Sequence, residues 1–194
     1  MLNGLKGKFH AHITVTAPEG EFQPPKGWKV TIIVLNKGDR SQQDVMITRH
    51  FMVGSEKTPY FMHILPELRD ANNQLLAMGL VPARTKLEHE DLPTVAPTAE
   101  YYRECHIKIR VPTGYDLQTV PGYVQSRNPM EVAAEYTTVF LNARYYSGTV
   151  EEVDDNIDAA VMAIRITNPG CAILEVKKES TVVDTNLNLD KWWA

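Results

Sequence analysis

The stretch KFHAHITVT (residues 8–16) alternates apolar and polar residues, as a strand with one buried face does. The stretch YRECHIKIRV (residues 102–111) alternates in the same way, and a shift of 94 residues places His12 on His106. The match between the two strands, held in one register by several identities, indicates an internal duplication. The same shift aligns Pro18 with Pro112, Gly20 with Gly114 and Gly54 with Gly148.

Working outward from these two stretches, each copy has the signals of a strand, a turn, a second strand, a helix and a last strand. The predicted strands are 8–16, 45–53 and 81–90 in the first copy and 102–111, 137–146 and 171–179 in the second. The β-branched run Lys29–Leu35 predicts one extra strand, whereas Val120–Ala134 is less regular. We therefore expect an α+β fold: duplicated ββαβ (ferredoxin-like) units that form a mostly antiparallel sheet or half-barrel with helices on one face. The chain is expected to be a single domain, 1–194, made of repeats 1–92 and 99–194.

The helices are marked by their ends. Thr149 and Glu152 form a capping box, and an apolar stripe follows at helical spacing until Pro169. In the first copy the helix follows Pro59 and ends at Gly79, and Pro66 predicts that it starts or kinks there.

Sorting the strand residues by parity separates two faces, because successive side chains of a strand point to opposite sides. One parity is apolar and is expected to pack under the helices; it includes Ala11, Ile13, Ile107, Leu174 and Val176. The other parity is crowded with histidine, cations and carboxylates, which are uncommon in a core. Either this is the solvated outer face of a sheet, with salt bridges between its strands, or it is a binding surface.

Charge and composition argue against some classes of partner. The 194 residues carry a net charge of −4 with a pI near 5.9, so the chain lacks the overall basic field of nonspecific nucleic-acid binders. Nucleic acid is therefore not an expected partner. Two cysteines are too few for a disulfide framework, and the N-terminus lacks a secretion signal, so we expect a cytoplasmic protein without a membrane partner. The oligomeric state is left open.

The motif His12-x-Thr14 resembles the first motif of the 2H phosphoesterase superfamily, which has two His-x-Thr/Ser motifs on strands of a duplicated α+β fold. The second copy has His106-x-Lys108, in which lysine replaces the hydroxyl residue. The resemblance implies that His12 and His106 act as general acid and base and that Thr14 holds a phosphodiester. Imidazole suits this chemistry because its pKa lies near neutral pH.

A second resemblance concerns the charged strands, which are similar to those of triphosphate-tunnel proteins. In that family such strands line a polar barrel that holds phosphate chains. The Glu-x-Glu-x-Lys motif of that family is absent. What the resemblance implies is an anionic ligand held by charge-assisted hydrogen bonds. The strands that carry it are Arg84-x-Lys86-x-Glu88, Glu104-x-His106-x-Lys108 and Glu175-x-Lys177.

Other kinds of site are weighed against this one. His10-x-His12 with His50 is a workable metal-ligand set, but nearby cations oppose it, and we expect no metal or other cofactor. Cys105 shares the apolar parity and is interpreted as buried rather than nucleophilic. The segment 126–128 is expected to be a surface loop.

The sequence thus predicts a polar cleft between the repeats that binds, and in the enzymatic case hydrolyses, a phosphate-bearing or anionic small molecule. The alternative is a non-enzymatic binding or protein-interaction module with a solvated charged face. The predicted catalytic pair is His12 and His106. The predicted substrate-binding residues are Thr14, His50, Arg84, Lys86, Glu88, Glu104, Lys108, Arg144, Glu175 and Lys177.

Overall fold

The computed structural model of the chain describes residues 5–16, 22–37, 40–54, 60–90, 97 and 101–187. Within them, three strands, a helix and a strand occur in order, and the same order then repeats. The first half contains β1 (Gly7–Val15), β2 (Lys29–Lys37), β3 (Arg40–Val53), α1 (Tyr60–Ala77) and β4 (Pro82–His89). The second half contains β5 (Arg103–Pro112), β6 (Val124–Val132), β7 (Tyr136–Tyr145), α2 (Val150–Thr167) and β8 (Ala172–Asp184).

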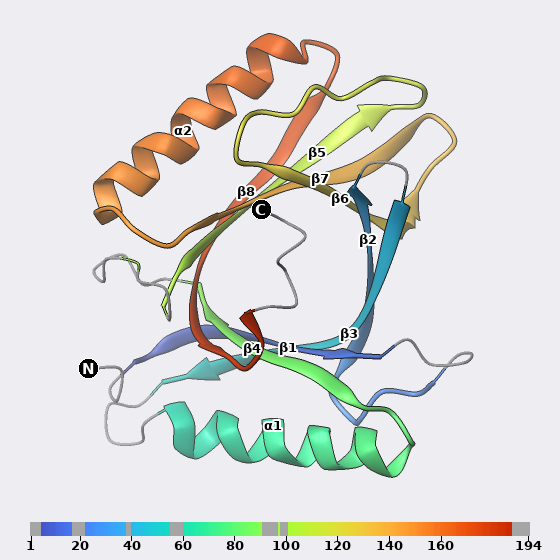
Figure 1. Cartoon of the computed structure of the whole chain (residues 1–194), viewed down its shortest axis with the longest axis vertical. Coiled ribbons are helices and arrows are strands. Elements are labelled where there is room, and N and C mark those ends of the chain that lie inside the picture. Colours follow the sequence, from blue (N-terminus) through green and yellow to red (C-terminus); the bar gives the residue numbers. More distant parts are fainter. Residues whose placement is uncertain are drawn as a thin grey trace.

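The strands form one closed antiparallel barrel in the order β1-β3-β2-β6-β7-β5-β8-β4, with β4 returning to β1 (Figure 1). The prediction of ferredoxin-like ββαβ units in an open sheet or half-barrel was therefore wrong. Each half supplies four neighbouring strands, and the halves meet at two seams, β4 with β8 and β2 with β6. The duplication remains a prediction, with which the repeated element order is consistent.

Two strand segments explain why the barrel closes. β8 runs to Asp184, beyond the predicted end at residue 179, and pairs with β5 through residues 172–180 and with β4 through residues 180–184. β6 forms within the stretch that we expected to be irregular and pairs with β2 through Arg127 and Ser126. Because both halves gain partners at their outer strands, the edges that an open sheet would expose are removed.

The two helices lie outside the barrel, each against its own half, so the expectation that they share one face was wrong (Figure 1). Between each helix and the barrel wall lies an apolar core. Ile64 and Leu75 of α1 pack in the first core with Ile13, and Ile157 of α2 packs in the second with Ile107. The prediction that this strand parity faces the helices is confirmed for these residues.

The expected burial fails at one place in β8. Leu174 and Val176 are 44% and 36% exposed, although their parity predicted burial. Val176 pairs with Ile107 and so points to the outer face of the barrel, as predicted. The register shift between Lys108 and Ile109 of β5 leaves Leu174 without a partner, as at a β-bulge.

The helix signals are largely confirmed. In α2 the Thr149 hydroxyl accepts from the Glu152 backbone N–H at 3.1 Å, and the Thr149 N–H donates to the Glu152 carboxylate at 2.7 Å. α1 begins at Tyr60 and contains Pro66, so the helix does not start at the proline. Across the described residues, neither helix has the length and hydropathy needed to cross a bilayer.

Candidate functional site

The polar parity of the strands lines a cavity of about 390 Å³ inside the barrel. Its walls come from both halves of the chain. The structure brings all twelve predicted site residues to this wall: His12, His106, Thr14, His50, Arg84, Lys86, Glu88, Glu104, Lys108, Arg144, Glu175 and Lys177.

Strand register arranges these residues in rows that run across neighbouring strands. In the first half, β4, β1 and β3 place Lys86, His12 and Thr48 side by side. In the second half, the matching row of β8, β5 and β7 is Lys177, His106 and Asn142. Each central strand thus carries a histidine that lies between a lysine and a side chain able to form hydrogen bonds.

The rows next to these are also alike. In the first half the row is Glu88, His10 and His50, with His10 in the middle, and in the second it is Glu179, Glu104 and Arg144, with Glu104 in the middle. A glutamate therefore occupies the last strand of each half at the level next to the histidine row.

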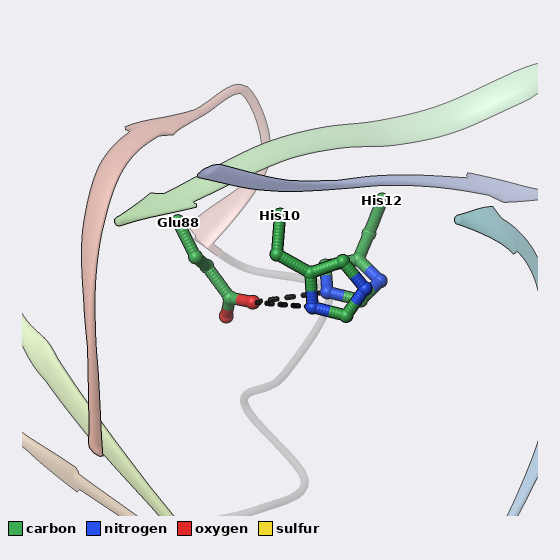
Figure 2. A group of neighbouring side chains, drawn as sticks. All are labelled: His10, His12 and Glu88. Atoms are coloured by element: carbon green, nitrogen blue, oxygen red, sulfur yellow. Dashed lines mark hydrogen bonds and ion pairs between the residues drawn. The ribbon is translucent and has the colours of Figure 1, made fainter. Parts of the chain in front are cut away.

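His12 is held by Glu88. The Nε2 atom of His12 lies 2.9 Å from Oε2 of Glu88, and both side chains are largely buried (Figure 2). Because an ionised carboxylate only accepts hydrogen bonds, Nε2 carries the hydrogen and Nδ1 keeps a lone pair. Nδ1 is buried and has no hydrogen-bond partner among the described residues.

Burial sets the charge of this imidazole. It lowers the pKa of His12 to about 4, even though the neighbouring Glu88 carboxylate acts in the opposite direction. At neutral pH His12 is therefore uncharged and able to accept a proton. This combination, an imidazole oriented by a carboxylate with its other nitrogen unpaired, is that of a general base.

The pKa of His106 is shifted in the opposite direction to that of His12. Its Nδ1 donates to Oδ1 of Asn142 at 2.7 Å, and its Nε2 lies 3.3 Å from Glu104 and 3.6 Å from Glu179. Burial disfavours the imidazolium, but hydrogen bonding to Glu104 and the surrounding carboxylates outweigh it and raise the pKa of His106. Asn142 is fixed in turn, because its amide donates to Ser126 Oγ at 2.8 Å.

Glu104 is the centre of the buried ion pairs. One of its oxygens accepts from Arg144 at 2.6 Å and the other from Lys86 at 2.6 Å. Lys86 also contacts Glu88 of its own strand, and its bond to Glu104 of β5 joins the two halves. Although burial alone would raise it, the pKa of Glu104 lies well below its usual value because of Lys86 and Arg144.

His10 and His50 extend the histidine group toward the surface. The ring centroid of His10 lies 4.0 Å from that of His12 and 4.0 Å from that of His50, on which it stacks. His50 is 67% exposed. Burial and then the charge of His10 lower the pKa of His50. The three rings thus lead from the interior to the surface.

Arg84 takes part in contacts that hold the barrel wall together. Its guanidinium binds Asp184 through two hydrogen bonds, at 2.9 and 2.5 Å, and donates to the Tyr102 hydroxyl at 2.9 Å. Burial would raise the pKa of Asp184, but Arg84 lowers it below its usual value. This pair joins β4 to the end of β8 and closes one level of the barrel.

Two groups of side chains have atoms close enough to share a metal ion: His10, His12 and Glu88, and Glu88, His106 and Glu179. In each group the atoms lie within 4.8 Å of one another. However, Lys86 contacts Glu88, and Nζ of Lys177 lies 3.4 Å from Nδ1 of His10. These ammonium groups repel a cation, so the site does not fit a metal well.

Sequence reasoning missed part of the site. Glu179 was not chosen, although it continues the parity of Glu175 and Lys177 and so could have been found. His10 was considered only as a metal ligand, and Asp184 lies beyond the predicted strand. Ser126 was assigned to a surface loop, but it is buried on β6 and lines the cavity.

Cys105 behaves as predicted. Cys105 is buried in the second core, and burial raises the pKa of its thiol to about 11, so it is not a nucleophile. His63, on α1, is exposed and lies outside the barrel cavity.

The site has no counterpart from which its function can be transferred. Comparison of the chain with protein-family models, with curated proteins and with solved structures finds no match.

Proposed function

We propose that the barrel binds a small phosphate-bearing or otherwise anionic molecule in its cavity, with His12 and His106 as the base and acid of a hydrolytic reaction. The observation that carries the proposal is the buried Nδ1 of His12, which has no hydrogen-bond partner among the described residues and whose ring is oriented by Glu88. A purely structural histidine would be expected to satisfy both ring nitrogens.

The charge of the wall supports an anionic ligand. The protein as a whole is acidic, but basic side chains outnumber acidic ones around the cavity. Raised proton affinity at His106 adds to this excess. The lining contains Arg84, Lys86, Lys108, Arg127, Arg144 and Lys177 against Glu88, Glu104, Glu175 and Glu179.

Stability alone does not account for such an interior. Removing ion pairs from water is costly, and well-packed apolar residues are often at least as stable in their place. Eight-stranded barrels of this size are commonly filled by side chains or hold one small ligand. A buried ionic network around a cavity of about 390 Å³ therefore favours a ligand.

The reaction that fits is general acid–base hydrolysis. His12 Nδ1 would take a proton from a water molecule as its oxygen bonds to phosphorus or to an acyl carbon, and the bond to the leaving oxygen breaks. His106, as an imidazolium, would give that oxygen a proton. The opposite pKa shifts of the two histidines suit these two roles.

The anion contacts are assigned from the place of each side chain on the cavity wall. Lys86 and Arg144 contact Glu104, so we assign them to setting the local potential. Lys108 lines the cavity beside Phe140 and is assigned to direct contact with the ligand. Thr14, two residues from His12 on the same strand face, is assigned to a hydrogen bond. The competing role is a non-enzymatic binding module, in which the same cavity holds an anion without turnover.

The test is a thermal-shift screen with nucleotides, cyclic nucleotides, inorganic phosphate, carboxylates and divalent metal ions. A ligand at about a hundred times its Kd stabilises the folded state by about 2.7 kcal/mol. We expect an anion to raise the Tm of wild type and of the control His63→Ala, and to raise it much less for Lys108→Ala.

Turnover is tested with the anion that binds best. We expect hydrolysis to be lost in His12→Ala and in His106→Ala while His63→Ala retains it. Binding without hydrolysis would favour the non-enzymatic module. A shift with zinc or manganese alone, or with none of the compounds, would contradict the proposal.

A further inference from the structure

The cavity has two chemically different walls. In the barrel order, the β4–β8 seam lies opposite the β2–β6 seam. The ionic wall, centred on β4 and β8, carries Lys86, Glu88 and Glu179. The apolar wall, which we define as Ile33 of β2, Met46 of β3 and Phe140 of β7, lies on the other side.

Strand register gives the spacing of the three residues of the apolar wall. Met46 is level with Thr31 of β2, and Phe140 is level with Ser126 of β6, which pairs with Leu35 of β2. Ile33 lies between these two levels. Two-residue steps along β2 separate the levels by about 7 Å each, so the wall extends over roughly 13 Å.

The apolar wall is incompletely covered. Ile33, Met46 and Phe140 line the inside of the closed barrel and are only partly buried. In the two cores between the barrel wall and the helices, apolar residues such as Ile13 and Ile107 are fully buried. Apolar surface facing a water-filled cavity costs free energy that an apolar ligand group would recover. Lys108 lies at its border, with Nζ 5.5 Å from the ring centroid of Phe140.

The volume of the cavity also favours a ligand with an apolar group. The volume of about 390 Å³ lies within the range of small-molecule sites, roughly 300–1,000 Å³. Inorganic phosphate alone would leave much of it, and the whole apolar wall, in contact with water.

We propose that the ligand is an amphipathic anion, with a phosphate or carboxylate group held by the basic side chains and an aromatic or aliphatic group packed on Ile33, Met46 and Phe140. This inference rests on the proposed function and specifies its substrate class. The acidic group lies near Lys108, so that the apolar group attached to it reaches Phe140.

The test compares non-hydrolysable anions by calorimetry, within two series that each share one acidic group: methylphosphonate, phenylphosphonate and hexylphosphonate, and acetate, benzoate and hexanoate. Phenylphosphonate or benzoate is expected to bind at least about tenfold more tightly than the methyl compound of its series, since burial of a ring is favourable. The better series identifies the acidic group.

Two variants test whether the apolar wall causes the difference in affinity. Phe140→Ala is expected to reduce the ratio of the two dissociation constants toward one, because the apolar wall loses its aromatic ring. Tyr136→Ala is the matched control, since Tyr136 is on the same strand, is 36% exposed and does not line the cavity. Its ratio should equal that of wild type.

The outcomes separate the two proposals. Equal affinities within each series, or an unchanged ratio in Phe140→Ala, would overturn the amphipathic ligand and leave the anion site standing. If no phosphonate or carboxylate of either series binds, both proposals fail. Tight binding of benzyl alcohol equal to that of phenylphosphonate would also refute the need for the acidic group.

Discussion

Oε2 of Glu88 lies 2.9 Å from Nε2 of His12, and the opposite nitrogen of the same ring is buried without a hydrogen-bond partner among the described residues. The two residues are 76 positions apart in the chain and meet because β1 pairs with β4. This contact fixes which nitrogen of His12 carries the hydrogen, and with it the direction in which the imidazole accepts a proton.

The buried state of His12 predicts acid sensitivity. In the unfolded chain its pKa is 6.5, and in the folded protein burial lowers it to about 4, so the unfolded state binds more protons in between. Protonation of His12 should therefore lower the free energy of unfolding by about 2 kcal/mol between pH 6.5 and pH 5. In His12→Gln that loss should be absent, as measured by urea unfolding at each pH. His63→Gln is the control, and an unchanged pH dependence in His12→Gln would contradict the assignment.

His106 predicts the opposite trend on the alkaline side. Its raised pKa means that its contribution is complete below pH 6.5, where both states are protonated, and is lost as the pH rises through the folded-state pKa. At pH 6 we expect His106→Gln to be about 2 kcal/mol less stable than wild type, in line with hydrogen bonds to charged groups. The difference should shrink toward pH 9. A difference that is constant with pH would argue for a neutral His106.

We expect the stability of the folded protein to depend strongly on Lys86. Its ammonium contacts both Glu88 and Glu104, and Lys86→Met leaves two buried carboxylates without it. Breaking such a pair costs about 3–5 kcal/mol, measured as the change in unfolding free energy. Adding Glu88→Gln to this variant should restore part of the loss.

The control for that experiment is a lysine of the surface. Lys8→Met removes an exposed pair with Glu90 at 3.9 Å and should cost less than about 1 kcal/mol. Equal losses of unfolding free energy in the two lysine variants would show that Lys86 does not belong to a buried ion network.

The β2–β6 seam should be the first part of the barrel to open. In the described residues it is joined by two residue pairs, Val34 with Arg127 and Leu35 with Ser126, whereas β1 and β3 pair along nine positions. Local opening follows regions with few such pairings. Amide hydrogen exchange should be faster at residues 34–35 and 126–127 than at Ile13 and Ile107. Equal protection would mean that the barrel opens only by global unfolding.

The capping box offers a test of the fold that leaves the cavity unchanged. Thr149→Ala removes the side-chain acceptor at the start of α2 and should lower stability by about 1 kcal/mol. Anion binding should be the same as in wild type. A loss of binding would indicate that α2 influences the cavity, which lies on the other side of the barrel wall.

Local features were predictable from short stretches. Alternation located β1, β5 and the apolar cores, and the capping box located α2, because these signals depend on neighbours in the chain. The strand β6 and the extension of β8 were missed, because they are stabilised by pairing with strands of the other half. Barrel closure depends on those two segments, so the open-sheet prediction failed with them.

For the site, the sequence by itself determined which side chains share a face: the parity of β1, β4, β5 and β8 is fixed by the two-residue period of a strand. The tertiary structure decided that this face turns inward, that Glu88 meets His12 and Asn142 meets His106, and that the pKa of His12 is lowered while that of His106 is raised. The reason is physical. Which side of a strand is polar follows from the residues themselves, but burial and partners come from strands that are far apart in the chain, and these set the pKa values.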